Sequence, residues 1–108
     1  MKLYISTPIN ARREVTFQAK REAAAKRCKM LKMFLEEEME GYEIVTPFDT
    51  IPLTETVNEE VAIGRCVTAV LRCDAIYLDH GWTGSKGCNI EYHAAKTYGK
   101  VIFEHDKM

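Results

Sequence analysis

The 108-residue sequence predicts an α/β protein in which a parallel sheet is covered by helices on both faces. Two observations lead to this fold class. Short segments rich in Ile, Val, Leu and Tyr alternate with longer helical segments, and the resulting order is β-α-β-α-β-α-β. The connection rules then favour a doubly wound parallel sheet of about four strands, in the order 2-1-3-4. We expect one domain that spans residues 1–108.

The first half of the chain contains two predicted strands and one long helix. Lys2–Ser6 is a short apolar strand, and Pro8 places a loop after it. Residues 14–40 are rich in Ala, Lys, Glu, Leu and Met, which predicts a helix. Its apolar stripe consists of Phe17, Ala24, Cys28, Leu31 and Leu35. The second strand is expected at 42–46, because Pro47 stops it.

The second half contains two further helices and two strands. The segment 56–59 has the form of a capping box and predicts the start of the second helix. The apolar stripe predicted for that helix consists of Val57, Val61, Gly64, Val67 and Leu71. The third strand is expected at 74–78, the third helix at 87–98, and the last strand at 100–104.

Composition excludes several classes of function. Hydrophobic residues make up 46% of the chain and charged residues 29%, and the net charge is −1. This balance argues against a nucleic acid polymer as partner. The basic residues of 12–32 are mixed with acids, which is typical of a solvated helix face, although a local role of Arg12 or Arg13 near the first loop stays open. No apolar run is long enough to span a membrane and no secretory segment is seen, so we expect a cytoplasmic protein.

The four cysteines give no sign of a metal site or a disulfide framework. Their spacing is neither C-x-x-C nor that of a zinc finger, and we expect all four to be reduced. His80, Cys88 and His93 are the residues that could meet around a metal, but they lack the tight spacing of ligands. No metal and no cofactor is therefore expected.

The strand order predicts where a ligand binds. In a sheet of order 2-1-3-4, the crevice lies at the carboxyl ends of the first and third strands. Two polar loops then face each other across it. One wall consists of Ser6, Thr7, Pro8, Ile9 and Asn10. The other wall includes Asp79, His80, Gly81, Trp82, Ser85, Lys86 and Gly87.

Glu91 is the carboxylate that follows the second wall on the third helix. It would point into the crevice if Ile90 and Ala94 face the sheet. There it has the chemistry of a nucleophile, or of a stabiliser for an oxocarbenium-like centre in glycosyl transfer. The structural alternative is an acid near a helix N-terminus that only complements the helix dipole.

Each of the other polar residues also has two readings. Ser85 either caps the third helix or binds a phosphate together with nearby backbone N–H groups. Asp79 and His80 are candidates for proton transfer to a leaving group, or turn residues at a strand end. Trp82 either packs under its loop or stacks on a planar ligand.

Taken together, these residues resemble a known family. The sequence is similar to the nucleoside 2-deoxyribosyltransferase superfamily, and most similar to its small bacterial and phage members. Four segments carry the resemblance: Leu3-Tyr-Ile-Ser-Thr-Pro-Ile9, Gly41-Tyr-Glu-Ile-Val-Thr-Pro-Phe48, Cys73-Asp-Ala-Ile-Tyr-Leu78, and Gly81-Trp-x-x-Ser-Lys-Gly-x-x-x-Glu-Tyr-x-x-Ala-Lys96.

The resemblance implies a Rossmann-like, flavodoxin-like fold and a function. It implies that Glu91 attacks the anomeric carbon of a 2-deoxyribosyl unit and that Tyr4 orients this carboxylate. Ser85 matches a serine that contacts the 5′-phosphate in related deoxynucleoside 5′-monophosphate N-glycosidases, which favours a nucleotide over a free nucleoside. The transferases carry an additional acid where this chain has Cys66. A homodimer or higher homo-oligomer is expected. Hydrolysis, transfer and a catalytically silent nucleotide-binding module all stay open.

Overall fold

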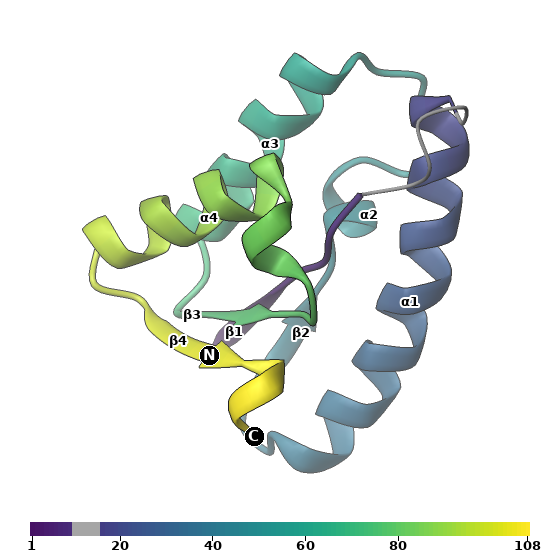
Figure 1. Ribbon diagram of the computed structural model, residues 1–108. Helices are drawn as coiled ribbons and strands as arrows, with labels where there is room; N and C mark the ends of the chain where they lie inside the picture. The colour runs from purple at the N-terminus through teal and green to yellow at the C-terminus, as the bar shows by residue number, and fades with distance from the viewer. Residues whose placement is uncertain (10–15) are drawn as a thin grey trace.

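The protein contains a four-stranded parallel sheet in the order β2-β1-β3-β4, with helices on both faces (Figure 1). The structure is a computed structural model and describes residues 1–9 and 16–108. The strands are β1 (Lys2–Ser6), β2 (Glu43–Val45), β3 (Ala75–Leu78) and β4 (Val101–Glu104). The predicted fold class and strand order are confirmed. Asn10, Arg12, Arg13 and the predicted start of the first helix lie outside the described residues.

The helices divide between the two faces of the sheet. The longer ones are α1 (Phe17–Glu38), α3 (Glu59–Leu71) and α4 (Lys86–Thr97), and the short ones are α2 (Pro47–Thr50), η1 (Trp82–Gly84) and η2 (His105–Lys107). α1 runs alone along one face, whereas α3 and α4 lie together on the other (Figure 1). Along the described residues, no helix combines the length and the apolar character needed to cross a membrane.

Side chains alternate along β1 and so supply both halves of the core. Leu3 and Ile5 belong to the cluster that packs against α1, whereas Tyr4 belongs to the cluster under α3 and α4. Successive side chains of a strand point to opposite faces, so Ser6 points the same way as Tyr4. β1 therefore presents two hydroxyl groups to the α3 and α4 side at its carboxyl end.

The start of α3 differs from the prediction. The N-cap is Asn58, whose side-chain oxygen accepts a hydrogen bond from Val61 N at 2.9 Å, so the capping box predicted at 56–59 is wrong. Asn caps a helix as well as Thr does, and this start puts Glu59 and Glu60 in the first turn, where the helix dipole favours acids. Val57 then lies before the helix and packs against the core.

The buried face of α3 also differs from the predicted stripe. Its buried residues are Ala62, Cys66, Ala69 and Val70. Val61 and Gly64 are exposed instead. The difference amounts to a rotation of the helix by about one residue, which brings small side chains onto the contact with β1 and α4. Small residues at such a contact allow the helix backbone to approach the sheet closely.

A short helix occupies part of the region predicted as a loop after the second strand. Thr46 caps α2 instead of continuing β2: its hydroxyl accepts from Phe48 N and Asp49 N, and the Asp49 side chain accepts from Thr46 N at 2.8 Å. Pro47 is the first residue of this helix, a position where its missing N–H costs nothing. The strand is therefore shorter than predicted.

A buried arginine fixes the chain between α2 and α3. Arg21 of α1 is only 2% exposed. Its guanidinium donates to the backbone oxygens of Ile51 at 3.0 Å, Pro52 at 3.1 Å and Glu55 at 2.7 Å, and to Gln18 Oε1 at 2.9 Å. Backbone carbonyls in place of a carboxylate partner satisfy this cation. One side chain thus anchors the connection that leads into α3.

Replacing this side chain tests the anchor. In Arg21→Met the aliphatic stem remains but three backbone carbonyls lose a charged donor, so we expect the free energy of unfolding to fall by about 2–4 kcal/mol. Chemical denaturation followed by circular dichroism measures it. The exposed neighbour Glu22→Ala is the control and should change stability by less than about 0.5 kcal/mol. Equal stability of the two variants would contradict the anchor role.

Candidate active site

The Glu91 carboxylate is held between α4 and the end of β1. Tyr4 Oη donates a hydrogen bond to Glu91 Oε2 at 2.8 Å, and Ser6 Oγ donates to Glu91 Oε1 at 2.6 Å. Glu91 is only 7% exposed. Each carboxylate oxygen thus accepts one hydroxyl donor from the same strand, which fixes the plane of the carboxylate.

The orientation of α4 differs from the expectation. Cys88, Glu91 and Ala95 form its buried face, whereas Ile90 is exposed, so the orientation with Ile90 against the sheet is not found, and Glu91 itself faces inward. Cys88 and Ala95 flank Glu91 at three and four residues' distance and are small, which leaves room for the carboxylate against the sheet. The two hydroxyl donors of β1 compensate its burial.

Burial changes the acidity of both partners in this contact. Loss of solvation raises the pKa of Glu91 from 4.5 to about 7, and the hydrogen bonds from Ser6 and Tyr4 act against that rise. The pKa of Tyr4 is raised well above its ordinary value by burial and by the neighbouring Glu91, so the phenol stays a donor. At neutral pH both the ionised and the protonated form of Glu91 are populated.

The raised pKa predicts how stability depends on pH. Because the folded protein prefers the protonated Glu91, this preference contributes fully below pH 4.5 and is lost as the pH rises through about 7. Relative to Glu91→Gln, the wild-type protein should therefore lose roughly 2–3 kcal/mol of unfolding free energy between pH 5 and pH 8. Urea denaturation at both pH values measures this difference. A difference that stays constant with pH would show that Glu91 titrates normally.

A cleft of about 350 Å³ opens beside Glu91 between β1, α1, α3 and α4. It is lined by Thr7, Ile9, Phe17, Lys20, Pro47, Glu59, Ala62, Ile63, Cys66, Gly84, Ser85, Lys86, Gly87, Cys88 and Glu91. Its wall thus combines apolar side chains with a few polar groups, as small-molecule sites do. Six residues of the predicted site lie in this lining: Thr7, Ile9, Ser85, Lys86, Gly87 and Glu91.

Several other residues of the lining are not part of the site that the sequence predicts. Lys20 was assigned to a solvated helix face, and Glu59 was read only as part of a capping pattern. Cys66 stands where the resemblance places an acid, and Cys88 was considered only as a metal ligand. Burial raises the pKa of each thiol to about 11, so both stay protonated at neutral pH. Only the folded arrangement brings these side chains to one cleft.

The two predicted walls meet at the carboxyl ends of β1 and β3. Asp79 N donates to Ser6 O at 3.0 Å, and Thr7 Oγ1 donates to Asp79 Oδ2 at 3.4 Å. Gly81 has φ +80°, a conformation that favours glycine, and a Cβ at this position would lie 4.0 Å from Pro8 Cγ. The crevice between the first and third strands is therefore formed as the topology predicts.

Asp79 and His80 are held by other partners. Arg27 of α1 donates to both oxygens of Asp79, at 3.0 and 2.8 Å, and His80 N donates to Asp79 Oδ1 at 2.7 Å. The exposed His80 ring pairs with Asp106, which raises the pKa of the imidazole. Neither side chain hydrogen-bonds to Glu91 or lines the cleft. Their role in proton transfer stays a prediction.

Ser85 caps a helix and Trp82 packs within the protein, which are the structural alternatives considered for them. Ser85 is the N-cap of α4, and its hydroxyl accepts a hydrogen bond from Cys88 N at 3.3 Å. The backbone N–H groups of Lys86 and Gly87 make no hydrogen bond within the described residues. Trp82 packs on Tyr92 with ring centroids 4.8 Å apart. The start of α4 thus offers free N–H donors to the cleft that Ser85, Lys86 and Gly87 line.

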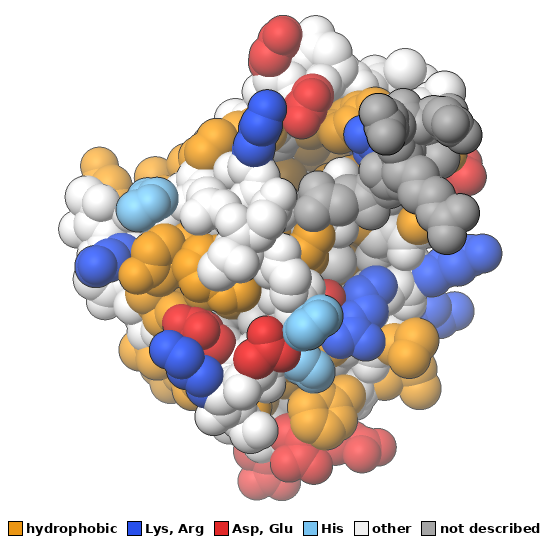
Figure 2. Space-filling view, in the orientation of Figure 1, with side chains coloured by type: hydrophobic (Ala, Val, Ile, Leu, Met, Phe, Trp, Pro, Cys, Tyr) orange, Lys and Arg blue, Asp and Glu red, His pale blue; other side chains and the backbone are white. Residues whose placement is uncertain are grey.

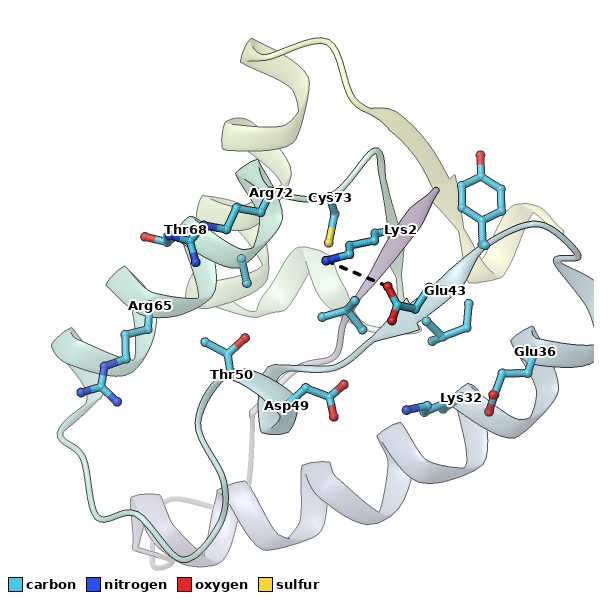
Figure 3. Close-up of a pocket in the computed structure, with 14 residues that line it drawn as sticks. Lys2, Lys32, Glu36, Glu43, Asp49, Thr50, Arg65, Thr68, Arg72 and Cys73 are labelled. Atoms are coloured by element: carbon cyan, nitrogen blue, oxygen red, sulfur yellow. Dashed lines mark ion pairs between the residues drawn. The ribbon is translucent and has the colours of Figure 1, made fainter.

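A larger cavity of about 740 Å³ lies at the opposite end of the sheet, beside β2 (Figure 3). Its basic lining residues are Lys2, Lys32, Arg65 and Arg72, and its acidic ones are Glu36, Glu43 and Asp49. Charges of both signs line this cavity, and Lys2 pairs with Glu43 at 4.0 Å. No described residue of the predicted site lines it. Among the residues described, no cluster of His, Cys, Asp and Glu has the arrangement of a metal site.

Comparison with known proteins identifies the class of fold and then the family. The structure is similar to that of a 2-desoxiribosyltransferase from Leishmania mexicana, with a TM-score of 0.64 and 16% sequence identity over 95% of this chain and 62% of that chain. The protein therefore has a deoxyribosyltransferase-like, Rossmann-type α/β fold. Residues 1–104 match the family described as "Domain of unknown function (DUF4406)", and the chain belongs to that family. No curated protein matches the sequence.

Proposed function

We propose that the protein cleaves the N-glycosidic bond of a nucleoside or nucleotide, with Glu91 as nucleophile and a deoxynucleoside 5′-monophosphate as the favoured substrate. The observation that carries the proposal is the buried Glu91 carboxylate, fixed by Tyr4 and Ser6 beside a cleft of about 350 Å³. The fold shared with a protein named as a 2-desoxiribosyltransferase supports it.

Fixing the carboxylate favours attack at an anomeric carbon. One Glu91 oxygen forms a bond to C1′ as the C1′–N bond breaks, and the bonding electron pair leaves with the base, which takes up a proton. Water then attacks C1′, which releases the deoxyribosyl unit and regenerates the carboxylate. The hydroxyls of Tyr4 and Ser6 hold the attacking group in one orientation before the reaction, which reduces the entropy lost on reaching the transition state.

The raised pKa of Glu91 also suits this role. A carboxylate stripped of water is a stronger nucleophile than a solvated one, and attack neutralises its charge. The cost is that only the ionised fraction reacts. Because the pKa of Glu91 in the free protein is about 7, kcat/KM should rise through that pH.

Preference for a 5′-phosphate is supported by the start of α4. The free N–H groups of Lys86 and Gly87 and the hydroxyl of Ser85 lie at a helix N-terminus, where anions bind favourably. Lys20 from α1 lines the same cleft and adds a positive charge. A phosphate here would place the sugar between the helix start and Glu91.

Three residues are candidates for delivering a proton to the leaving base. Asp79 and His80 were expected from the sequence to assist the departing base. Glu59 is the other carboxylate in the cleft lining and is exposed to solvent. If one of them is the general acid, its amide or alanine variant should lower the rate of base release by roughly 10²-fold or more.

Base release from nucleotides tests the proposal. The protein is incubated with each deoxynucleoside and each deoxynucleoside 5′-monophosphate, and free base is measured by chromatography. We expect release from a monophosphate, a loss of about 10³-fold or more in Glu91→Gln and a smaller loss in Tyr4→Phe. The exposed Glu60→Gln, one residue from Glu59 on α3, is the matched control and should keep full activity.

Two results would contradict the proposal. One is base release that persists unchanged in Glu91→Gln. The other is a nucleotide that raises the melting temperature without any base release, because a ligand that binds only the folded state stabilises it. That second result would identify a catalytically silent binding module. Addition of a second base as acceptor separates transfer from hydrolysis, since only transfer yields a new nucleoside or nucleotide.

A further inference from the structure

We propose that the outer face of α1 pairs antiparallel with the α1 helix of a second copy of the chain. This face is the α1 seam, formed by Ala23, Lys26, Met30, Met33 and Glu37. All five residues are exposed. The seam is separate from the buried face of the same helix, where Ala24, Cys28, Leu31 and Leu35 pack against the sheet.

The seam follows one face of α1. Its residues are three, four, three and four positions apart, the spacing that keeps side chains on one side of a helix, and Met30 and Met33 form its apolar centre between charged ends. A helix that only covers a sheet needs one such stripe, and α1 already has it on its buried face. The second stripe follows the outer side of the same helix.

The centre of the seam is apolar and exposed. Met30 and Met33 are each 64% exposed, and the adjacent Phe34 is 48% exposed. Three large apolar side chains within five residues form one patch, and patches of this kind mark contact surfaces more often than scattered single residues do. Methionine is well suited to such a contact because its flexible side chain adapts to its partner.

The charges on either side of the apolar patch favour an antiparallel arrangement with a second copy of α1. Lys26 and Lys29 precede the methionines and Glu37 follows them, and Figure 2 shows basic, hydrophobic and acidic side chains in this order down the edge of the molecule that α1 forms. In an antiparallel pair centred between Met30 and Met33, Met30 lies opposite Met33 of the partner subunit. The same register sets Lys26 opposite the partner's Glu37. A parallel pair would instead set Lys26 opposite another Lys26.

The contact is two-fold symmetric and therefore closes as a dimer. Each subunit contributes one Lys26 and one Glu37, so two complementary charge pairs flank a methionine centre. The cleft beside Glu91 takes Phe17 and Lys20 from α1, and neither belongs to the seam. The dimer thus leaves the cleft open, and the inference stands independently of the proposed function.

The oligomeric state of the full chain tests the pairing. Sedimentation equilibrium at up to about 100 μM protein should show a dimer for the wild type, which requires a dissociation constant below roughly that concentration. The double variant Met30→Asp/Met33→Asp should raise that constant by at least about tenfold. Circular dichroism and thermal melting show whether the variant is folded. A monomeric wild type, or a dimer unaffected in the folded variant, would overturn the proposal.

Charge reversal tests the register. Lys26→Glu and Glu37→Lys should each weaken the dimer by about tenfold, because each creates two like-charge contacts, and the double variant should restore wild-type affinity within about threefold. Lys107→Glu, an exposed lysine outside α1, is the control and should leave the dimer unchanged. Failure of the double variant to restore the dimer would rule out the antiparallel register.

Discussion

Burial of one carboxylate constrains much of the arrangement around the cleft. Glu91 has no cationic partner among the described residues. The hydroxyls of Tyr4 and Ser6 therefore supply the hydrogen bonds that offset the loss of solvation of its carboxylate. Both must come from one face of β1, which places them two residues apart at the carboxyl end of the strand. α4 must in turn present small residues around the carboxylate, and Cys88 and Ala95 fulfil this. The contact ties β1 to α4, 85 and 87 residues apart in the sequence.

Two acids near the crevice, Asp79 and Glu91, have different kinds of hydrogen-bond partner. Asp79 is buried and accepts hydrogen bonds from two nitrogens of the Arg27 guanidinium and from the backbone N–H of His80, so it links the end of β3 to α1. Glu91 receives only neutral donors, and burial raises its pKa to about 7. Asp79 thus has a cationic partner, whereas Glu91 has none among the described residues. The contrast singles out Glu91 as the group whose charge changes near neutral pH.

The sequence predicted the sheet and its crevice because strand ends are marked by local chemistry. Proline follows the first two strands, and the short apolar runs of a parallel sheet are distinctive, so the order 2-1-3-4 and the two facing loops followed. The buried face of each helix was harder to predict from the sequence. α3 turns Ala62 and Cys66 inward, and small residues give a weak periodic signal. α4 buries a glutamate, which a hydrophobic pattern assigns to solvent. Arg21 lies in the charged segment that predicts a solvated helix face. It is nevertheless buried, and backbone carbonyls accept the hydrogen bonds of its guanidinium.

The ionisation of Glu91 is the property on which the account rests, and it can be measured without a substrate. Carbon-13 NMR of the side-chain carboxyl groups, with the Glu91 signal assigned by its absence in Glu91→Gln, follows the titration of this one group. We predict a midpoint at about pH 7, because burial outweighs the two hydroxyl donors. A midpoint near 4.5, the ordinary value for a solvated glutamate, would contradict the account.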